Sequence, residues 1–482
     1  MKNKLFAAND TKLFCTNYFV FAINFYNLLH YFIMSRLFGT NGVRGVTNKD
    51  MTVELALKLG KSIGTFFKGD IVIGADTRTS NEMLEDAVIA GLLSTGCNVF
   101  DAGMISSPAL QYHVKESDKK GGVIITASHN PPEFNGIKVI DGDGTELGKE
   151  KEDKIEDIYF NEKWGAAEWN KIGNVYKIEA TETYIDAVLS KVDVDAIKRK
   201  GFTVVLDCGN GAGCVAEPYI LSKLGCRVIT LNAHPDGTFP GRNAEPIKEN
   251  VGELMNMVRE CGADAGIAYD GDADRAIFID ERGEYVYGDK TLAIISAYMV
   301  ERKGGKIVTP VSTSSCVEEL VRKKGGEIVY TRVGSPIVAR KMIEIDATFG
   351  GEENGGLIFP SHQYCRDGGM ASAAILEIMA LKDKKLSELA KEVPEYHLVK
   401  IKVKCDSKKK QEIMDAFIKN EDGNVDLTDG AKIYLKDAWV LVRPSGTEPI
   451  IRIYAEGKEI ETARRLANEY KEKLERVIAE LK

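Results

Sequence analysis

Residues 202–231 read FTVVLDCGNGAGCVAEPYILSKLGCRVITL and give the clearest indication of the fold. The β-branched run Phe202–Asp207 predicts a strand, Ala216–Leu224 predicts a helix, and Arg227–Leu231 predicts a second strand. A dinucleotide-binding turn of the pattern G-x-G-x-x-G would need glycine at position 214, where the chain has Cys214. We therefore interpret the glycine-rich segment as a strand-to-helix turn of an α/β unit and do not expect NAD binding.

The same strand–helix–strand order occurs around residues 71–125 and around residues 306–330. In the first of these, Ile71–Gly74 and Gly122–Ile125 are predicted strands, and Asn81–Leu93 is a predicted helix. Units of this kind at three places imply three α/β domains of similar construction with mixed sheets. We find no exact sequence repeat among them, so their similarity is architectural.

The end of the chain has a different pattern. After Pro394, the segments Leu398–Val403 and Trp439–Val442 alternate as in an antiparallel sheet, and a charged helix is expected over Ile460–Leu481. This predicts a smaller C-terminal α+β domain. The expected domain ranges are 34–180, 181–286, 287–394 and 395–482. No low-complexity linker separates them, so we expect them to pack into one body.

Composition excludes several classes of protein. The 482 residues suggest roughly three domains. With 44% hydrophobic and 28% charged residues, the chain is neither disordered, nor collagenous, nor a small disulfide scaffold. A net charge of −8 gives no bulk attraction to nucleic acid or to anionic membranes. The nine cysteines form no C-x-x-C pair, which favours free buried thiols in a reducing cytoplasm.

Residues 1–33 differ from the rest of the chain because they are rich in Phe and Asn and contain no Gly or Pro. Their apolar part, Tyr18–Ile33, is shorter than the roughly 20 residues that span a bilayer and is interrupted by polar residues. No signal-peptide cleavage pattern follows. We interpret the segment as a mis-assigned extension that precedes the start at Met34, the alternative being an amphipathic or weakly anchoring helix.

The first loop whose side chains could take part in a reaction is Thr126–Pro132, directly after the predicted strand Gly122–Ile125. Ligands of α/β sheets bind at the carboxyl ends of strands, which makes Ser128 a candidate nucleophile. Its neighbour His129 is adjacent in sequence, so the two side chains are expected to diverge and not to form a Ser-His-Asp triad. The alternative is an ordinary serine turn before proline.

The second loop is Asp270-Gly271-Asp272-Ala273-Asp274-Arg275, between the predicted strands Ala265–Tyr269 and Ala276–Ile279. Three carboxylates at every second position repel one another unless a cation gathers them, and oxygen ligands select Mg²⁺ or Ca²⁺. An EF-hand is excluded, because its sixth position requires glycine and Arg275 stands there. We predict a Mg²⁺ site with positions open for phosphate oxygens, against the alternative of solvated turn carboxylates.

Two further loops offer groups for a phosphorylated sugar. Gly350–Gly356 combines flexible glycines with Glu352 and Asn354, whose side chains suit sugar hydroxyls. Arg443–Pro449 combines an arginine fork with two hydroxyls and a glycine, which suits an anion such as phosphate. A mobile polar loop and a surface turn, respectively, remain the alternatives.

Together these loops resemble those of the α-D-phosphohexomutase superfamily, from about Arg36 to the end of the chain. The superfamily's signatures occur in order: an opening Phe38-Gly39-Thr40-Asn41-Gly42-Val43-Arg44-Gly45, then Asp76-Thr77-Arg78-Thr79-Ser80, and then the four loops above. One loop per domain in the right order is a specific match. The resemblance implies a heart-shaped architecture of four domains, which fits three α/β units and a smaller end domain.

The resemblance implies an isomerase in which Ser128 carries a phosphoryl group and exchanges it with a sugar phosphate through a bisphosphosugar. It places one Mg²⁺ per chain on Asp270, Asp272, Asp274 and an oxygen of phosphorylated Ser128. It puts Arg44, His129, Lys138 and Arg275 near the reacting group, with Lys138 or His129 as general acid/base. It assigns sugar hydroxyls to Glu352 and Asn354, and the non-reacting phosphate to Arg443, Ser445, Gly446 and Thr447.

One departure from the family pattern concerns the sugar loop. The family often ends this loop Ser-Gly-His, whereas the present chain has Asn354-Gly355-Gly356. Recognition of the hydroxyls is therefore expected to differ in detail.

The identity of the sugar is open between two readings. The opening motif and R-P-S-G-T-E-P are similar to those of phosphoglucosamine mutases, whereas the loop with Asn354 resembles archaeal-type enzymes, some of which act on mannose or glucose phosphates. We favour glucosamine 6-phosphate. A non-catalytic sugar-phosphate sensor is disfavoured because Ser128 and the aspartates are intact. The resemblance also implies a sugar bisphosphate activator, a cytoplasmic monomer or homodimer, and no nucleic-acid or membrane partner.

Overall fold

The computed structural model describes residues 36–39, 41–421, 423–445 and 448–481. The chain divides into two compact units, Met1–Phe38 and Gly39–Lys482, and the second contains all four sheets. The extension expected at residues 1–33 lies outside the described residues. Within the described part of the chain, no helix is both long enough and apolar enough to cross a membrane.

The first α/β domain is built on a six-stranded mixed sheet of order β1-β5-β4-β2-β3-β6. Strands β2 and β4 are buried along their whole length, as expected for parallel strands covered on both faces. Strand β5 pairs antiparallel with β4 and with β1, so the end of β4 lies beside the start of β5. The elements are β1 (Val43–Val46), α2 (Val53–Phe67), β2 (Ile71–Ala75), α3 (Asn81–Ser94), β3 (Val99–Met104), α4 (Ser107–Glu116), β4 (Gly121–Ile125), β5 (Phe134–Asp141), α5 (Lys149–Phe160) and β6 (Val175–Lys177).

The second domain has the sheet order β11-β10-β9-β7-β8, with β7 parallel to its two neighbours and β9 antiparallel to β10. The glycine-rich segment after β7 is a strand-to-helix turn that leads into α8, as the sequence predicted. The elements are α6 (Thr181–Leu189), α7 (Val194–Lys200), β7 (Thr203–Asp207), α8 (Gly213–Lys223), β8 (Arg227–Leu231), α9 (Gly252–Cys261), β9 (Ala265–Tyr269), β10 (Ala276–Asp280) and β11 (Tyr285–Val286).

The third domain repeats this plan with the order β13-β12-β14-β15-β16. Its helix α13 is almost wholly buried because it is apolar on all sides, and one continuous apolar core joins it to the first two domains. The elements are α10 (Gly288–Lys303), β12 (Lys306–Pro310), α11 (Ser315–Lys323), β13 (Glu327–Thr331), α12 (Ser335–Ile345), β14 (Phe349–Gly351), β15 (Leu357–Phe359), β16 (Gln363–Arg366), α13 (Gly368–Lys382) and α14 (Leu386–Glu392).

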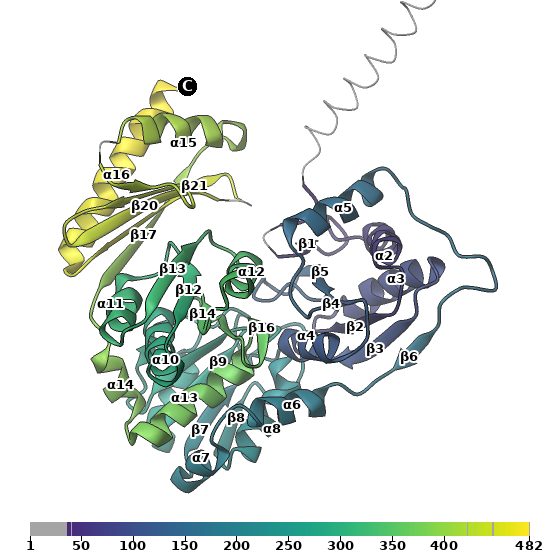
Figure 1. Ribbon diagram of the computed structural model, residues 1–482, viewed down its shortest axis with the longest axis horizontal. Helices are drawn as coiled ribbons and strands as arrows, with labels where there is room; N and C mark the ends of the chain where they lie inside the picture. Colours follow the sequence, from purple (N-terminus) through teal and green to yellow (C-terminus); the bar gives the residue numbers. More distant parts are fainter. Residues whose placement is uncertain (1–35, 40, 422, 446–447, 482) are drawn as a thin grey trace, which may run out of the picture. The chain divides into compact units, whose positions relative to one another are not determined.

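The C-terminal domain is smaller and has an antiparallel sheet of order β17-β21-β20-β19-β18, as the alternating pattern predicted (Figure 1). Along β20, Val440 and Val442 pack with the helices in one core, while Trp439 and Leu441 pack on the opposite face with Val311 of the third domain. The elements are β17 (His397–Lys404), η1 (Ser407–Lys409), α15 (Lys410–Lys419), β18 (Val425–Asp426), β19 (Ala431–Tyr434), β20 (Ala438–Pro444), β21 (Ile450–Gly457) and α16 (Ile460–Glu480).

The cysteines of the described residues are free thiols, as predicted, but not all are buried. Cys261 is exposed at the end of α9, and three others are half-buried. The expectation of uniformly buried thiols was therefore wrong. Cys261 lies on the solvent-facing side of α9, whereas Leu254 and Val258 of the same helix are the buried residues.

Candidate active site

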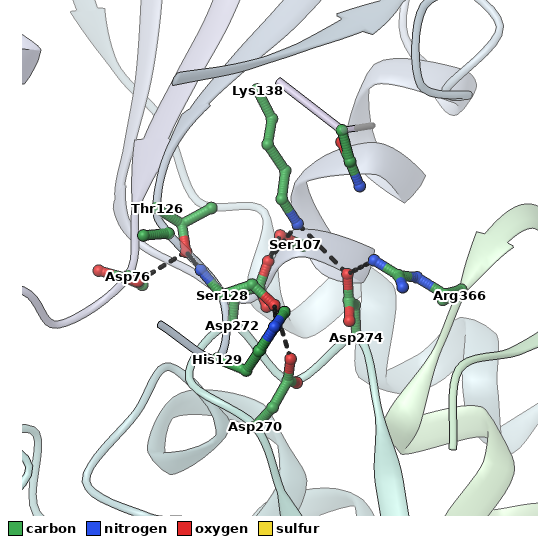
Figure 2. A network of polar contacts seen from close by, with 12 residues as sticks. Asp76, Ser107, Thr126, Ser128, His129, Lys138, Asp270, Asp272, Asp274 and Arg366 are labelled. Atoms are coloured by element: carbon green, nitrogen blue, oxygen red, sulfur yellow. Dashed lines mark hydrogen bonds and ion pairs between the residues drawn. The ribbon is translucent and has the colours of Figure 1, made fainter. Parts of the chain in front are cut away.

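Ser128 follows the carboxyl end of β4, and its side chain is fully buried. Its hydroxyl Oγ donates a hydrogen bond to Oδ2 of Asp270 at 2.7 Å, which Figure 2 shows. The backbone of Ser128 has a φ of 52°, a left-handed value that is uncommon for a residue with a Cβ atom. Thr126 stabilises this turn, since its Oγ1 accepts from Ser128 N at 2.8 Å and donates to Asp76 at 2.6 Å. The loop thereby holds the serine hydroxyl against the second domain.

Arg78 holds the backbone of the serine loop in place through hydrogen bonds. Its guanidinium donates to four backbone carbonyl oxygens at 2.6 to 2.9 Å, those of Ser128, Asn130, Pro131 and Phe134. Asp76 in turn pairs with Nε of Arg78 at 3.2 Å, and both side chains are buried. Because one planar group satisfies four carbonyls, the loop has little freedom to move without breaking several charge-assisted hydrogen bonds.

Asp270, Asp272 and Asp274 lie in the turn between β9 and β10. All three are buried, and each offers a carboxylate oxygen within 4.8 Å of the others. Oδ1 of Asp272 and Oδ1 of Asp274 are buried without a hydrogen-bond partner. Burial, together with the charges of its two neighbours, raises the pKa of Asp270 well above its usual range. Clustered carboxylates with orphaned acceptor atoms fit a hard divalent cation such as Mg²⁺.

Gly271 allows the aspartate loop to approach the serine loop. A Cβ atom at this position would lie 2.4 Å from the carbonyl oxygen of Ser128. No side chain fits at that distance, so glycine at position 271 is a requirement of the contact between the two loops.

Lys138 on β5 contributes a buried cation. Its Nζ lies 2.5 Å from Asp272 Oδ2 and 3.2 Å from Asp274 Oδ2 (Figure 2). Burial alone would lower the pKa of Lys138, but the two carboxylates outweigh it and raise the pKa. Burial likewise opposes the charge of Asp272, yet Lys138 and the hydroxyl of Ser107, at 2.5 Å, hold its pKa below the usual range. The two groups stay ionised as a pair.

Arg44 and His129 also contact the serine loop. Arg44 donates to the carbonyl of Ala127 at 3.2 Å and to Oδ1 of Asn130 at 3.1 Å, and burial lowers its pKa. The Nδ1 atom of His129 lies 3.4 Å from Ser128 Oγ. The expectation that these adjacent side chains diverge was therefore wrong, because the left-handed turn at Ser128 brings the ring back toward the hydroxyl.

The serine hydroxyl bonds to Asp270, so His129 is not part of a Ser-His-Asp triad in this structure. Arg275 holds the pKa of His129 far below its usual range, with burial and Arg44 acting in the same direction. The imidazole is therefore neutral. Arg275 itself borders the aspartates, with Nε 3.8 Å from Asp270 Oδ2 and 3.7 Å from Asp274 Oδ1.

The sugar loop joins this cluster through Glu352 and Arg366. Oε1 of Glu352 accepts from Gly334 N at 3.2 Å, and Oε2 accepts from Arg366 at 3.4 Å. Burial raises the pKa of Glu352 although Arg366 opposes it. The same Arg366 reaches Asp274 Oδ2 at 2.5 Å (Figure 2). Half-buried Asn354 accepts from Gly356 N at 3.0 Å.

The fourth loop belongs to the C-terminal domain. Arg443 stands near the end of β20, and its Nε pairs with Asp429 Oδ2 at 3.0 Å. Ser445 Oγ accepts from Glu448 N at 3.1 Å, which closes the loop upon itself. The predicted phosphate-binding residues Gly446 and Thr447 lie outside the described residues.

Family models match all four domains of the chain. They are those of phosphoglucomutase/phosphomannomutase, with α/β/α domain I over residues 35–166, domain II over 182–283, domain III over 287–396, and the C-terminal domain over 401–473. The chain belongs to the phosphoglucomutase/phosphomannomutase family. The resemblance to the α-D-phosphohexomutases inferred from the loops is confirmed.

Two named proteins are similar in sequence to this phosphohexomutase over most of their length. A phosphoglucomutase/phosphomannomutase of Thermococcus kodakarensis is 48% identical, over 89% of this chain and 96% of the relative. A phosphoglucosamine/phosphogalactosamine mutase of Sulfurisphaera tokodaii is 44% identical, over 92% of this chain and 100% of the relative.

Solved structures share the fold of this phosphohexomutase. A phosphoglucomutase/phosphomannomutase family protein of Burkholderia thailandensis has a TM-score of 0.84 at 23% identity, covering 92% of this chain and 98% of that chain. An N-acetylphosphoglucosamine mutase of Aspergillus fumigatus, in complex with GlcNAc-6P and magnesium, has a TM-score of 0.58 at 15% identity, covering 92% and 96%. At these identities the likeness concerns the fold.

Sequence reasoning missed several buried groups that contact the predicted site residues of this phosphohexomutase. Asp76 and Arg78 belong to a motif that was noted without a role, and their hydrogen bonds now give one. Ser107 and Arg366 had no local signal, because each reaches an aspartate far away in the sequence. Only a contact across domains reveals them.

Proposed function

We propose that the protein interconverts glucosamine 6-phosphate and glucosamine 1-phosphate, with Ser128 as a phosphorylated intermediate. The observation that carries the proposal is the 2.7 Å hydrogen bond from Ser128 Oγ to Asp270, inside a buried cluster of aspartates. A hydroxyl fixed beside a cation site at the end of a strand suits phosphoryl transfer, in which catalysis consists largely of positioning and charge stabilisation.

In the proposed cycle, phosphorylated Ser128 gives its phosphoryl group to a hydroxyl of the sugar phosphate. The bond between Ser128 Oγ and phosphorus breaks, and a bond between the sugar oxygen and phosphorus forms. The resulting bisphosphosugar turns end for end and returns its other phosphoryl group to Ser128. Mg²⁺, held by Asp270, Asp272, Asp274 and a phosphoserine oxygen, would neutralise the negative charge of the group in transfer.

The cationic residues around Ser128 supply the remaining electrostatic stabilisation. Lys138 remains protonated beside Asp272 and Asp274, so we assign it to charge stabilisation and proton donation. The Nδ1 atom of His129 lies 3.4 Å from Ser128 Oγ, so we assign it to accepting the proton of the attacking hydroxyl once the negative phosphoryl group on Ser128 offsets the arginines that lower its pKa. Arg44, which contacts the serine loop, and Arg275, which borders the aspartates, add further positive charge for binding the phosphoryl group.

In this proposal the substrate is recognised by two loops other than the serine loop, namely Gly350–Gly356 and Arg443–Pro449. Glu352 and Asn354 bind sugar hydroxyls, while Arg443, Ser445, Gly446 and Thr447 bind the phosphate that does not react. Buried Glu352 accepts one hydrogen bond at each oxygen, from Gly334 N and from Arg366, which fixes the carboxylate and leaves it lone pairs for a sugar hydroxyl.

Glucosamine is favoured by the name of the relative from Sulfurisphaera tokodaii, and by the opening and phosphate-binding motifs. The relative from Thermococcus kodakarensis favours the second candidate, a phosphoglucomutase/phosphomannomutase activity. We further propose a sugar bisphosphate as activator, action in the cytoplasm, and a small hexose or hexosamine phosphate as partner of a monomer or homodimer. The Aspergillus complex with GlcNAc-6P and magnesium supports the ligand classes.

The test compares glucosamine, mannose and glucose 6-phosphates at equal concentration, with Mg²⁺ and a trace of the matching bisphosphate. We expect the highest kcat/KM with glucosamine 6-phosphate. A higher value with mannose or glucose 6-phosphate would establish the second candidate instead. Turnover of none of the three would refute the proposed function.

A further inference from the structure

Gly356, at the end of the sugar loop, has no room for a side chain because Arg366 occupies the space. A Cβ atom at this glycine would lie 2.3 Å from Cδ and 3.0 Å from Cγ of Arg366. These atoms are in the middle of the arginine side chain, and their movement would shift the guanidinium as well. The glycine at position 356 is thus sterically matched to an arginine on β16.

The guanidinium of Arg366 connects two loops of the active site. One terminal nitrogen lies 2.5 Å from Asp274 Oδ2, and the other lies 3.4 Å from Glu352 Oε2. The side chain is only 5% exposed. A buried arginine therefore stands between a carboxylate of the candidate metal site and the carboxylate assigned to the sugar.

The two partners of Arg366 differ, because only Asp274 keeps a buried carboxylate oxygen without a hydrogen-bond partner. Asp274 accepts through Oδ2 from Arg366 at 2.5 Å and from Lys138 at 3.2 Å, and its Oδ1 is buried without a hydrogen-bond partner. Glu352 is held at both oxygens, by Gly334 N and by Arg366. Groups that hydrogen-bond to a metal-binding carboxylate fix its orientation and influence metal affinity.

We propose that Arg366 is a positioning residue that sets the orientation of Asp274 toward the metal and of Glu352 toward the sugar. It occupies the volume that a side chain at position 356 would take, and it ties the metal loop to the sugar loop. The inference rests on the proposed function, because it assigns Asp274 and Glu352 the roles given there.

The first experiment measures Mg²⁺ binding by calorimetry in the full-length protein, without any sugar. Arg366→Met keeps the bulk of the side chain and removes its charge. We expect Mg²⁺ affinity to fall by about 10- to 100-fold, the usual effect of removing a group that orients a metal ligand. Arg366→Lys should recover part of this loss. Unchanged or tighter Mg²⁺ binding in Arg366→Met would overturn the proposal.

The second experiment measures steady-state kinetics at saturating Mg²⁺. Arg366→Met should raise KM for the sugar phosphate by roughly tenfold with a smaller change in kcat, since Glu352 loses an orienting partner. The matched control is Arg340→Met, which removes an arginine of the same domain that pairs with Asp141 and Asp143 at 3.1 and 2.8 Å. This control should leave KM and Mg²⁺ affinity unchanged.

A double-mutant cycle tests the steric part of the proposal. Gly356→Ala alone should displace Arg366 and weaken Mg²⁺ binding, whereas in an Arg366→Ala background the same change should cost nothing further. Additive effects would show that the two positions are independent and would contradict the proposal. A wild-type protein that is inactive on all three sugars would refute the proposed function. The effect of Arg366 on Mg²⁺ affinity could still be judged, because Mg²⁺ binding is measured without sugar.

Discussion

Asp429 holds the guanidinium of Arg443, with its Oδ2 atom 3.0 Å from Nε of the arginine. The same carboxylate oxygen accepts from Val333 N of the third domain at 3.1 Å. The next residue, Gly334, donates its backbone N–H to Glu352. One short chain of contacts therefore links the arginine of the fourth loop to the carboxylate of the sugar loop. Because the ion pair engages Nε, it is compatible with a bidentate phosphate contact through the terminal nitrogens.

Arg443→Ala should weaken substrate binding more than it slows chemistry. The phosphate held by this loop forms and breaks no bond while it is held there. A charge-assisted contact is worth ~1.5–3 kcal/mol, which corresponds to roughly a 10- to 100-fold higher KM with kcat nearly unchanged. Arg443→Lys should recover only part, since it keeps the charge without the fork. Steady-state kinetics measure both values, and an unchanged KM would remove this residue from the phosphate site.

Asp429→Asn should have a smaller effect of the same kind. Asparagine preserves the shape at position 429 but removes the charge that orients Arg443. We expect KM to rise by several-fold, on the order of 1 kcal/mol, with kcat retained. In an Arg443→Ala background the substitution should add little, because its partner is already absent. Fully additive effects of the two substitutions would argue against a positioning role.

The fold and the loops were predictable to different degrees. Strands such as Arg227–Leu231 and Ala265–Tyr269 end where the sequence predicted, because glycines or charged turns flank their β-branched and apolar residues. The Ser128 and Asp270–Asp274 loops were found because the chemistry of each is contained in a few consecutive residues. The structure then placed these loops in hydrogen-bond contact.

The residues that support those loops could not be found in this way. Arg366 contacts Asp274, which is 92 positions away, and Ser107 contacts Asp272, which is 165 positions away. Neither forms a local pattern, so only the packing of separate domains shows their role. The failed expectation about His129 has a similar cause, since the left-handed backbone of Ser128 is a property of the folded loop and not of residue type.

Ser128→Ala should abolish turnover and leave the fold intact. The variant loses the oxygen that bonds to Asp270 and, in the proposed mechanism, carries the phosphoryl group. Activity should fall by roughly 10³-fold or more, as for other lost nucleophiles. Intact-mass and peptide analysis of the wild type should find a fraction with one extra phosphate at Ser128, absent from the variant. Wild-type turnover by a folded Ser128→Ala protein would rule out this mechanism.

Asp272→Asn should impair Mg²⁺ binding more than the fold. Asparagine still accepts from Ser107 and Lys138, which contact Oδ2 of the aspartate, but it lacks the negative charge that a cation requires. The Mg²⁺ concentration for half-maximal activity should increase by at least roughly tenfold. A magnesium titration of activity, checked against direct calorimetry, measures this. Full activity of the wild type in excess chelator would contradict the metal requirement.

Glu217 on α8 gives a prediction about stability outside the active site. Its side chain is fully buried, and neither carboxylate oxygen has a hydrogen-bond partner. Burial raises the pKa of Glu217 well above the usual range and outweighs the backbone N–H groups of Glu217 and Ala216, which lower it, while the carboxylate of Asp367 and the thiol of Cys214 also raise it. The buried rings of Tyr184 and Tyr269, whose own pKa values Glu217 raises, offer no positive charge to oppose this. The folded protein therefore keeps a proton on Glu217 at pH values at which the unfolded chain has released it.

The unfolded chain releases that proton above about pH 4.3, the ordinary value for glutamate. The contribution of Glu217 to stability is thus complete below that pH and is lost as the pH rises toward the folded pKa, by up to about 1.4 kcal/mol per pH unit. Glu217→Gln has no proton to lose, so its melting temperature should exceed that of the wild type by a margin that widens from pH 5 to pH 8. The matched control is Glu182→Gln. Glu182 is exposed on α6 and pairs with Lys223, which lies on α8 as Glu217 does. The difference in melting temperature between this variant and the wild type should not widen with pH. A constant difference between Glu217→Gln and the wild type across this range would mean that Glu217 is ionised in the folded protein, which its burial without a partner argues against.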